Sequence, residues 1–188
     1  MPTDTGIYTP EEATYGHDFS YRLAQWIGEY LPKDERVADF GCGPATYLRY
    51  LHDIGFEHLI GFEGTKQNFE YGHVNVCDIT VPFKENGIVP EGHNTICLEV
   101  GEHIPEPLLP VFFDNLISVV GIGKLILSWA IPGQDGIGHV SCRHNIWVVN
   151  EFEKRGFKLL VEDSISARNI VENRVSYFRN TIMIFEKK

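Results

Sequence analysis

A pair of glycines follows a short apolar run that begins at Val37. The motif is Asp39-Phe40-Gly41-Cys42-Gly43-Pro44-Ala45, and a segment with helical character follows it. A strand that ends in a glycine turn and opens a helix presents backbone N–H groups at the carboxyl edge of a sheet, where small ligands bind. Glycine lacks a Cβ, so a ligand can lie against the main chain. The motif therefore predicts a binding site for a small ligand, although an ordinary tight turn is the alternative.

The next apolar run is followed by an acidic residue, Glu63, which lies 22 residues after Gly41. That run is Leu59-Ile60-Gly61-Phe62. A carboxylate at the end of a strand can accept hydrogen bonds from both hydroxyls of a ribose. Together with the glycine motif it predicts a nucleoside-containing cofactor. The dinucleotide pattern G-x-G-x-x-G requires glycine where this chain has Thr46, which disfavours a dinucleotide.

The glycine motif resembles motif I of the class I S-adenosylmethionine-dependent methyltransferases, written acid-x-Gly-x-Gly-x-Gly, with Ala45 in place of the last glycine. The resemblance covers nearly the whole chain from Phe19. It implies that Glu63 binds the ribose hydroxyls and that Asp78 and Ile79 meet the adenine. The other implied cofactor residues, around the amino-acid tail, are Asp39, Gly41, Cys42, Gly43 and Glu99. The alternatives are a surface role for Glu63 and an Asx turn at Asp78.

The segment Cys97-Leu98-Glu99-Val100-Gly101-Glu102-His103-Ile104-Pro105 resembles the fourth-strand motif of many small-molecule methyltransferases. The resemblance places Glu99 near the cofactor tail or the acceptor, and His103 beside the transferred methyl group. An imidazole with a pKa of roughly 6.5 suits the removal of a hydroxyl proton near neutral pH. The alternative is that His103 caps the next helix or supports the glycine loop.

A glycine-rich loop, Pro132-Gly133-Gln134-Asp135-Gly136-Ile137-Gly138, precedes His139. Similar loops follow the fifth strand in the same family, and such a loop can close over a site and exclude water. His139 is the rival general base, or else a loop histidine bonded to backbone. Glu99, His103 and His139 could also ligate a divalent metal, but no closely spaced pair of ligands is present, so a metal is not favoured.

Apolar periodicity predicts the elements that position these residues. Strands are expected at 36–40, 58–62, 72–76, 95–100, 124–129, 157–161 and 181–185. Helices are expected at 19–31, from the glycine turn to 54, and at 65–71, 106–120 and 145–155, with none between the last two strands. The alternation predicts one doubly wound α/β sheet with helices on both faces. The family resemblance adds seven strands, mostly parallel, with an antiparallel last strand.

Composition limits the remaining choices. A length of 188 residues fits one domain, which we place at 15–188, with residues 1–14 as a flexible arm or lid. The net charge of −10 disfavours a nucleic-acid partner. The four cysteines are scattered, and no secretory signal or membrane-length apolar run is present, which favours the cytoplasm. The oligomeric state is not predicted.

The resulting hypothesis is an S-adenosylmethionine-dependent methyltransferase acting on oxygen of a sugar or another small hydroxylated molecule. Neither Asn-Pro-Pro-Tyr nor Pro-Cys occurs, which disfavours amino-nitrogen and cytosine-carbon acceptors. The alternatives are a protein or peptide methyltransferase, a non-catalytic module that keeps the fold, and, more weakly, an NAD-dependent enzyme. Tyr15, His17, Tyr21 and Trp147 either line the acceptor site or belong to the core.

Overall fold

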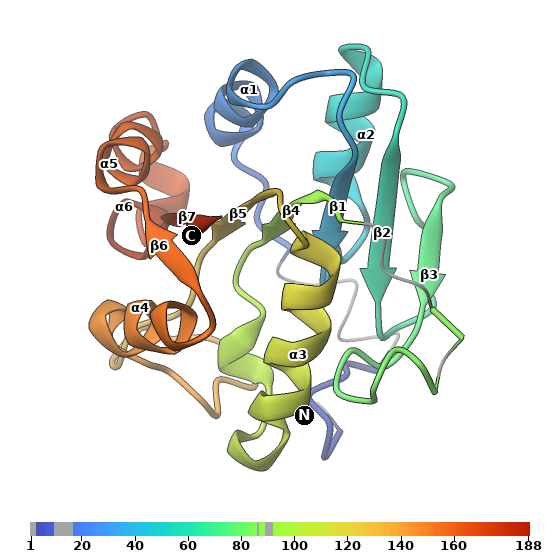
Figure 1. The fold of residues 1–188 in the computed structure, drawn as a ribbon, viewed down its shortest axis with the longest axis vertical. Helices are drawn as coiled ribbons and strands as arrows, with labels where there is room; N and C mark the ends of the chain where they lie inside the picture. Colours follow the sequence, from blue (N-terminus) through green and yellow to red (C-terminus); the bar gives the residue numbers. More distant parts are fainter. Residues whose placement is uncertain (1–2, 10–16, 86, 89–91) are drawn as a thin grey trace.

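The computed structural model describes residues 3–9, 17–85, 87–88 and 92–188, and its centre is one seven-stranded sheet (Figure 1). The strand order is β3-β2-β1-β4-β5-β7-β6. The strands are β1 (Val37–Phe40), β2 (Leu59–Glu63), β3 (Val74–Val76), β4 (Asn94–Cys97), β5 (Lys124–Leu127), β6 (Phe157–Leu159) and β7 (Met183–Lys187). The α/β fold class predicted from the sequence is therefore confirmed.

The direction of the strands also agrees with the prediction. β1 pairs in parallel with β2 and β4, and β2–β3 and β4–β5 are parallel as well. β7 lies antiparallel to both β5 and β6. The carboxyl ends of β1, β2, β4 and β5 therefore meet at one edge of the sheet, where ligands bind in open α/β folds.

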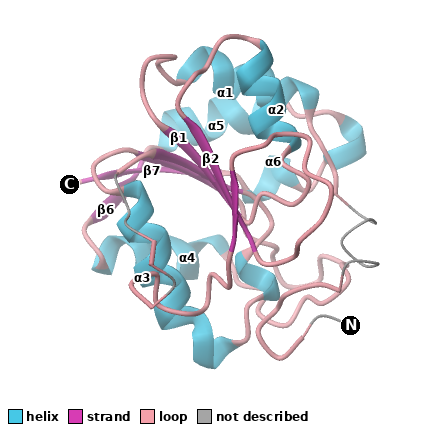
Figure 2. Cartoon of the chain, turned by 90° about the vertical axis from the view of Figure 1, so that its right-hand side faces the viewer, coloured by secondary structure: helices cyan, strands magenta, loops and turns pink. Residues whose placement is uncertain are grey.

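Helices cover both faces of the sheet (Figures 1 and 2). One face carries α1 (Tyr21–Tyr30), α2 (Thr46–Asp53), α5 (Val161–Asn169) and α6 (Phe178–Thr181), and the other carries α3 (Leu109–Val120) and α4 (Asn145–Lys154). The 3-10 turns are η2 (Gly101–His103), η3 (Glu106–Leu108) and η4 (Asn173–Val175).

Two apolar cores hold these layers together because the central strands are buried on both sides. All four residues of β1 are buried, as a strand between two helical layers requires. Phe40 packs its ring against Phe62, Phe83 and Phe112 on the α3 side. On the opposite side Leu48 of α2 belongs to the other core. This packing fixes β1, from which the glycine turn starts.

Several expectations about the elements are wrong, among them the start of the last strand, since Thr181 belongs to α6 and β7 begins at Met183. Residues 65–71 form no helix, since the Thr65 N–H and hydroxyl are used in bonds to Glu63 and Tyr8 instead of capping one. Helices do separate the last two strands, because α5 begins at Val161, where the sixth strand was expected to end. The expected fourth strand is too long, because Glu99 has a φ of 53° that no strand accommodates.

The first described residues, 3–9, cross the edge of the sheet near the carboxyl ends of the strands. Thr65 Oγ1 donates to the Tyr8 carbonyl at 2.6 Å, and Tyr8 Oη donates to the Ile137 carbonyl at 2.6 Å. The segment thus joins the loop after β2 to the loop after β5. Residues 1–2 and 10–14 of the expected arm lie outside the described residues.

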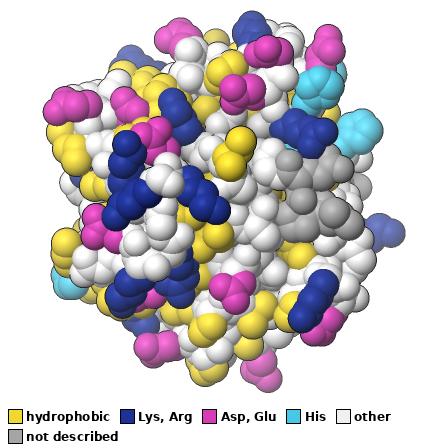
Figure 3. Space-filling view, viewed as in Figure 1, with side chains coloured by type: hydrophobic (Ala, Val, Ile, Leu, Met, Phe, Trp, Pro, Cys, Tyr) yellow, Lys and Arg dark blue, Asp and Glu magenta, His cyan; other side chains and the backbone are white. Residues whose placement is uncertain are grey.

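The surface carries both signs of charge. On the face in Figure 3, several Lys and Arg side chains gather on the left, near α4 and β6, beside acidic ones. Basic side chains of α4 and β6 form ion pairs: Lys154 and Arg155 bind Glu151, and Lys158 binds Glu186. Among the described helices, none has both the length and the apolar character needed to cross a membrane.

Candidate functional site

A cavity of about 380 Å³ opens at the carboxyl edge of the sheet. This volume lies within the usual range for small-ligand sites, about 300–1,000 Å³. Its lining includes almost all the site residues predicted from the sequence: Asp39, Gly41, Cys42, Gly43, Glu63, Ile79, Glu99, His103 and His139. Asp78 is the one predicted residue that does not line it.

The glycine turn after β1 leaves no room for side chains. Gly41 has a φ of +80°, and a Cβ there would lie 2.6 Å from a methyl carbon of Val100. Gly43 has a φ of +52°, and its Cβ would lie 2.6 Å from the His17 ring. Ala45, where the family has glycine, takes a left-handed φ of 66°. The backbone geometry of the motif is thus kept at a modest strain, about 1–2 kcal/mol.

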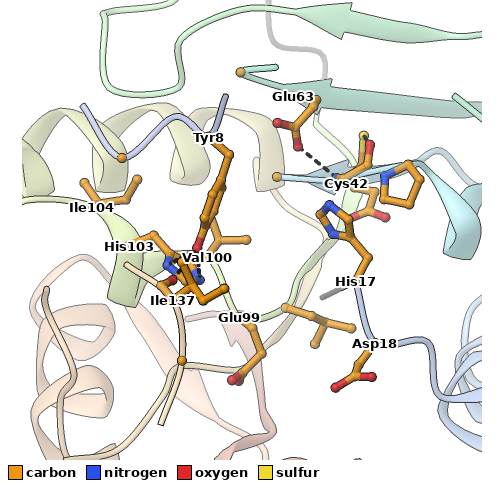
Figure 4. Close-up of a pocket in the computed structure, with 18 of the residues that line it drawn as sticks. Tyr8, His17, Asp18, Cys42, Glu63, Glu99, Val100, His103, Ile104 and Ile137 are labelled. Atoms are coloured by element: carbon orange, nitrogen blue, oxygen red, sulfur yellow. Dashed lines mark hydrogen bonds between the residues drawn. The ribbon is translucent and has the colours of Figure 1, made fainter. Parts of the chain in front are cut away.

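Glu63 ends β2 and faces this turn (Figure 4). Its Oε2 accepts a hydrogen bond from the Gly43 N–H at 2.8 Å, and its Oε1 accepts one from the Thr65 N–H at 2.9 Å. Burial raises the pKa of Glu63, and these backbone donors and His17 counteract it. The carboxylate is therefore held in place at the cavity wall.

Asp39, the acid of the motif, is 3% exposed at the end of β1. Burial raises its pKa to about 8, and the nearby Glu63 carboxylate adds to the effect. A buried carboxyl group with this pKa gains from a cationic partner, because a positive charge favours its ionised form.

Asp78 forms an Asx turn, which was the sequence-based alternative to adenine binding. Its Oδ1 accepts hydrogen bonds from the Thr80 N–H at 2.8 Å and the Thr80 hydroxyl at 2.6 Å. The next residue, Ile79, lines the cavity and is anchored through its carbonyl, which accepts from Asn115 Nδ2 at 2.9 Å. The turn thus presents Ile79 to the cavity.

Glu99 follows β4 in a strained conformation. Its φ of 53° is unusual for a residue with a side chain, and such strain is concentrated at functional sites. The Glu99 N–H donates to Ser128 Oγ at 2.8 Å, and its Oε2 accepts from Gln134 of the glycine-rich loop. The structure therefore turns this carboxylate into the cavity.

His103 and His139 come from different loops and meet at one corner of the cavity. Their ring centroids are 4.9 Å apart at an interplanar angle of 63°. His103 Nδ1 lies 2.7 Å from Tyr8 Oη (Figure 4) and 3.2 Å from the Gly138 carbonyl. His139 Nδ1 lies 3.1 Å from the Gln134 carbonyl. Burial lowers the pKa of His103 to about 4, and His139 contributes, so the His103 imidazole is neutral at neutral pH.

Glu102 stands behind these histidines, and sequence reasoning did not assign it a role. Its side chain is fully buried, and its Oε1 lies 4.0 Å from His139 Nε2. Burial raises the pKa of Glu102, and the Glu99 carboxylate raises it further. Glu102, His103 and His139 each offer one ligand atom within 4.8 Å of the others. The Glu-His pair in the sequence was visible, but nothing in it showed which acid is buried.

Other lining residues were also missed because they come from distant segments. Tyr8 and Asp18 precede the first helix, and Tyr177 lies between the last helices. Of the aromatic wall considered for the acceptor, His17 lines the cavity. Tyr21 is 58% exposed and Trp147 packs on Trp129, while Tyr15 lies outside the described residues.

No protein-family model matches the sequence, and no curated protein matches it significantly. Solved structures do match in three dimensions. A methyltransferase from Archaeoglobus fulgidus superposes with a TM-score of 0.63 at 17% identity, covering 89% of this chain and 91% of that one. A TehB-like methyltransferase from Corynebacterium glutamicum gives 0.62 at 19% identity, covering 95% and 93%. Magnesium protoporphyrin IX methyltransferase from Synechocystis, with bound S-adenosylmethionine, gives 0.62 at 14% identity, covering 95% and 89%.

These likenesses concern the fold. All three proteins are described as S-adenosylmethionine-dependent enzymes or hold that molecule, and each covers most of this chain. The chain therefore has the fold of the class I methyltransferases, as the motif resemblance implied.

Proposed function

We propose that this protein is a methyltransferase that uses S-adenosylmethionine and acts on a hydroxyl group of a sugar or another small molecule. The proposal rests on one observation: at the wall of the cavity, Glu63 is hydrogen-bonded to the backbone N–H of Gly43 in the glycine turn. The similar fold of proteins that bind S-adenosylmethionine or its demethylated product supports it.

The cavity fits this cofactor in its chemistry. Gly41 and Gly43 line the cavity without side chains, so their main chain forms part of the wall that the cofactor tail would meet. Glu63 would accept the ribose hydroxyls, and Asp39 would face the ammonium group of the tail. Ile79 would contact the adenine, and Asp78 would hold the turn that presents it. Cys42 and Glu99 complete the proposed cofactor contacts.

The acceptor would enter at the corner formed by His103, His139 and Glu99. S-adenosylmethionine, when bound, supplies an activated methyl group that the acceptor oxygen takes while the sulfur keeps the bonding electrons and the hydroxyl proton leaves. The imidazoles of His103 and His139 and the carboxylate of Glu99 line this part of the cavity. A neutral imidazole or an ionised carboxylate can accept the hydroxyl proton. Holding the oxygen in line with the methyl group would contribute most of the rate enhancement.

A small acceptor is favoured over a protein. Residues 3–9 cover the cavity through Tyr8, which bonds to Thr65 and Ile137 on opposite sides of it. A cavity partly covered in this way suits a small molecule better than a folded protein. The acidic net charge leaves a basic peptide as the second candidate. All four cysteines are free thiols, which supports a reducing compartment such as the cytoplasm.

The test is direct calorimetry followed by turnover. Titration of the purified chain with S-adenosylmethionine and with its demethylated product should release heat, while NAD should not. Absence of heat for both methyl-donor forms would contradict the proposal. Release of demethylated product should then be measured with sugars and small alcohols, and with lysine- and histidine-containing peptides. Binding without turnover on any acceptor would indicate a non-catalytic module.

A further inference from the structure

Glu102 carries a carboxyl group that the fold buries completely, beside the Ala130 backbone and the Glu99 carboxyl group. The residue is 0% exposed, and among the described residues neither carboxyl oxygen has a hydrogen-bond partner. The neighbouring Glu99 Oε1 is also buried and unpartnered. Arg143 does not neutralise the pair, because it binds Glu106 at 3.1 Å. Buried carboxylates are normally paired with a cation, bound to a metal or neutralised by a proton.

The two imidazoles next to Glu102 are oriented as metal ligands usually are. A carbonyl oxygen only accepts hydrogen bonds, so His103 Nδ1 and His139 Nδ1 carry the protons that face Gly138 O and Gln134 O. This leaves Nε2 of each ring with its lone pair. Such an Nδ1–H bond to a backbone carbonyl is the common outer contact that fixes a metal-binding histidine.

The backbone fixes the three residues relative to one another. The Glu102 carbonyl accepts hydrogen bonds from the N–H groups of Val140 at 2.9 Å and Ser141 at 2.8 Å. The turn that carries Glu102 and His103 is thereby tied to the loop that carries His139. His139 Nε2 faces Glu102 Oε1 at 4.0 Å, a lone pair opposite an acid, which is unfavourable unless a proton or cation lies between them.

We propose that Glu102, His103 and His139 bind a divalent transition-metal ion at the inner corner of the cavity. Two imidazoles and one carboxylate suit Zn²⁺ and ions of similar preference, whereas Mg²⁺ and Ca²⁺ prefer oxygen ligands alone. With three protein ligands, the ion would keep open coordination positions for other ligands. Because His103 and His139 line the cavity, these open positions would face it.

This inference deepens the proposed function and rests on it for the identity of the acceptor. A hydroxyl oxygen bound at an open position loses its proton more easily, because the metal charge stabilises the oxyanion. The proton would pass to Glu99, whose Oε1 is unpartnered and whose side chain lines the cavity. The histidines would then act as ligands, and the acceptor would be a molecule whose hydroxyl can coordinate the ion.

Metal binding can be tested without the cofactor or any acceptor. The untagged 188-residue chain, freed of metal by chelation, is titrated with Co²⁺ while visible absorption is recorded, and Zn²⁺ is then used to displace the Co²⁺. We expect one equivalent of Co²⁺ with an absorption band typical of a low-coordinate nitrogen–oxygen site, and a rise in Tm when Zn²⁺ is added.

Variants locate the ion. Glu102→Gln and His139→Gln should each lower the affinity by more than the roughly 10–100-fold that loss of an outer contact costs. His52→Gln, on the exposed surface of α2, should change nothing. Circular dichroism of the metal-free variants shows whether they are folded, and Glu102→Gln should preserve the fold because Gln has nearly the shape of the buried carboxyl group.

Two results would overturn the proposal: no Co²⁺ band and no Zn²⁺ effect on the Tm of the wild type, or binding that both variants leave unchanged. In the first case a proton neutralises Glu102, and His103 or His139 keeps the role of general base. Neither result bears on the methyltransferase proposal, which calorimetry with S-adenosylmethionine tests separately.

Discussion

The backbone N–H of Gly43 donates a hydrogen bond of 2.8 Å to Oε2 of Glu63, which joins the glycine turn after β1 to the last residue of β2. The two features that the sequence separates by about twenty residues are thus one unit in space. Each holds the other in the position in which a nucleoside cofactor would need it.

Replacing Glu63 with Gln should weaken binding of S-adenosylmethionine by roughly 10–100-fold, because hydrogen bonds to a charged group contribute about 1.5–3 kcal/mol. Calorimetry measures the Kd. Glu57→Gln, in an exposed loop before β2, is the matched control. An unchanged Kd in Glu63→Gln would remove Glu63 from the proposed ribose site.

Gly41→Ala and Gly55→Ala form a second matched pair. Both glycines have positive φ angles, +80° and +99°, so both substitutions strain the backbone. Only the Cβ at position 41 meets Val100, whereas nothing lies within 4 Å of one at position 55. We expect Gly41→Ala to be less stable by a further 1–3 kcal/mol, the usual range for overpacking at about one methyl group, and to lose cofactor affinity. Urea unfolding and calorimetry check both; equal effects in the two variants would contradict the steric argument.

The stability of the ligand-free protein should depend on pH through Asp39. Its pKa is about 8 in the folded chain, because of burial and then of Glu63, against an ordinary value of 3.8. Between these values the folded chain holds a proton that the unfolded chain has released. Stability should therefore fall as the pH rises from about 4 to about 8, by at most about 1.4 kcal/mol per pH unit from this group.

Asp39→Asn removes this titration. Urea unfolding of the wild type and the variant between pH 5 and 8 should show the wild type losing stability relative to Asp39→Asn as the pH rises. Parallel curves would mean that Asp39 is ionised throughout and already has a cationic partner.

We propose that the N-terminal segment acts as a lid, and its deletion tests this. Removing residues 1–9 takes away Tyr8 and its bonds to Thr65 and Ile137. Dissociation of S-adenosylmethionine should become faster, because the segment no longer covers the cavity. A stopped-flow chase measures the rate. Tyr8→Phe, which keeps the backbone bond to Thr65 but loses the hydroxyl bonds to Ile137 and His103, should have an intermediate effect. An unchanged rate in the deletion would contradict the lid.

Much of the fold could be predicted because its elements are strongly patterned. The run before Asp39 is apolar on both faces, and Gly121 ends α3 with a φ of 55°, as a glycine after an apolar helix suggests. α5 was missed for the opposite reason: it buries only Ser164 and Ala167, so it has no apolar stripe to detect.

The site could be predicted in part. Glu63 and the glycine turn are close in space because both follow neighbouring parallel strands, and that rule works from sequence. Tyr8 and Glu102 could not be found in this way. The position of Tyr8 depends on a contact with His103 across 95 residues, and the burial of Glu102 depends on how two loops pack.

The order of the strands has a consequence for how the chain is made. β6 pairs only with β7 in the described sheet, and β7 ends at Lys187. During synthesis, β6 leaves the ribosome with no neighbour to hydrogen-bond, and it must wait for some thirty further residues before its partner emerges. The far edge of the sheet is therefore expected to assemble last, after translation of β7, whereas the strands that carry the glycine turn and Glu63 can already have paired.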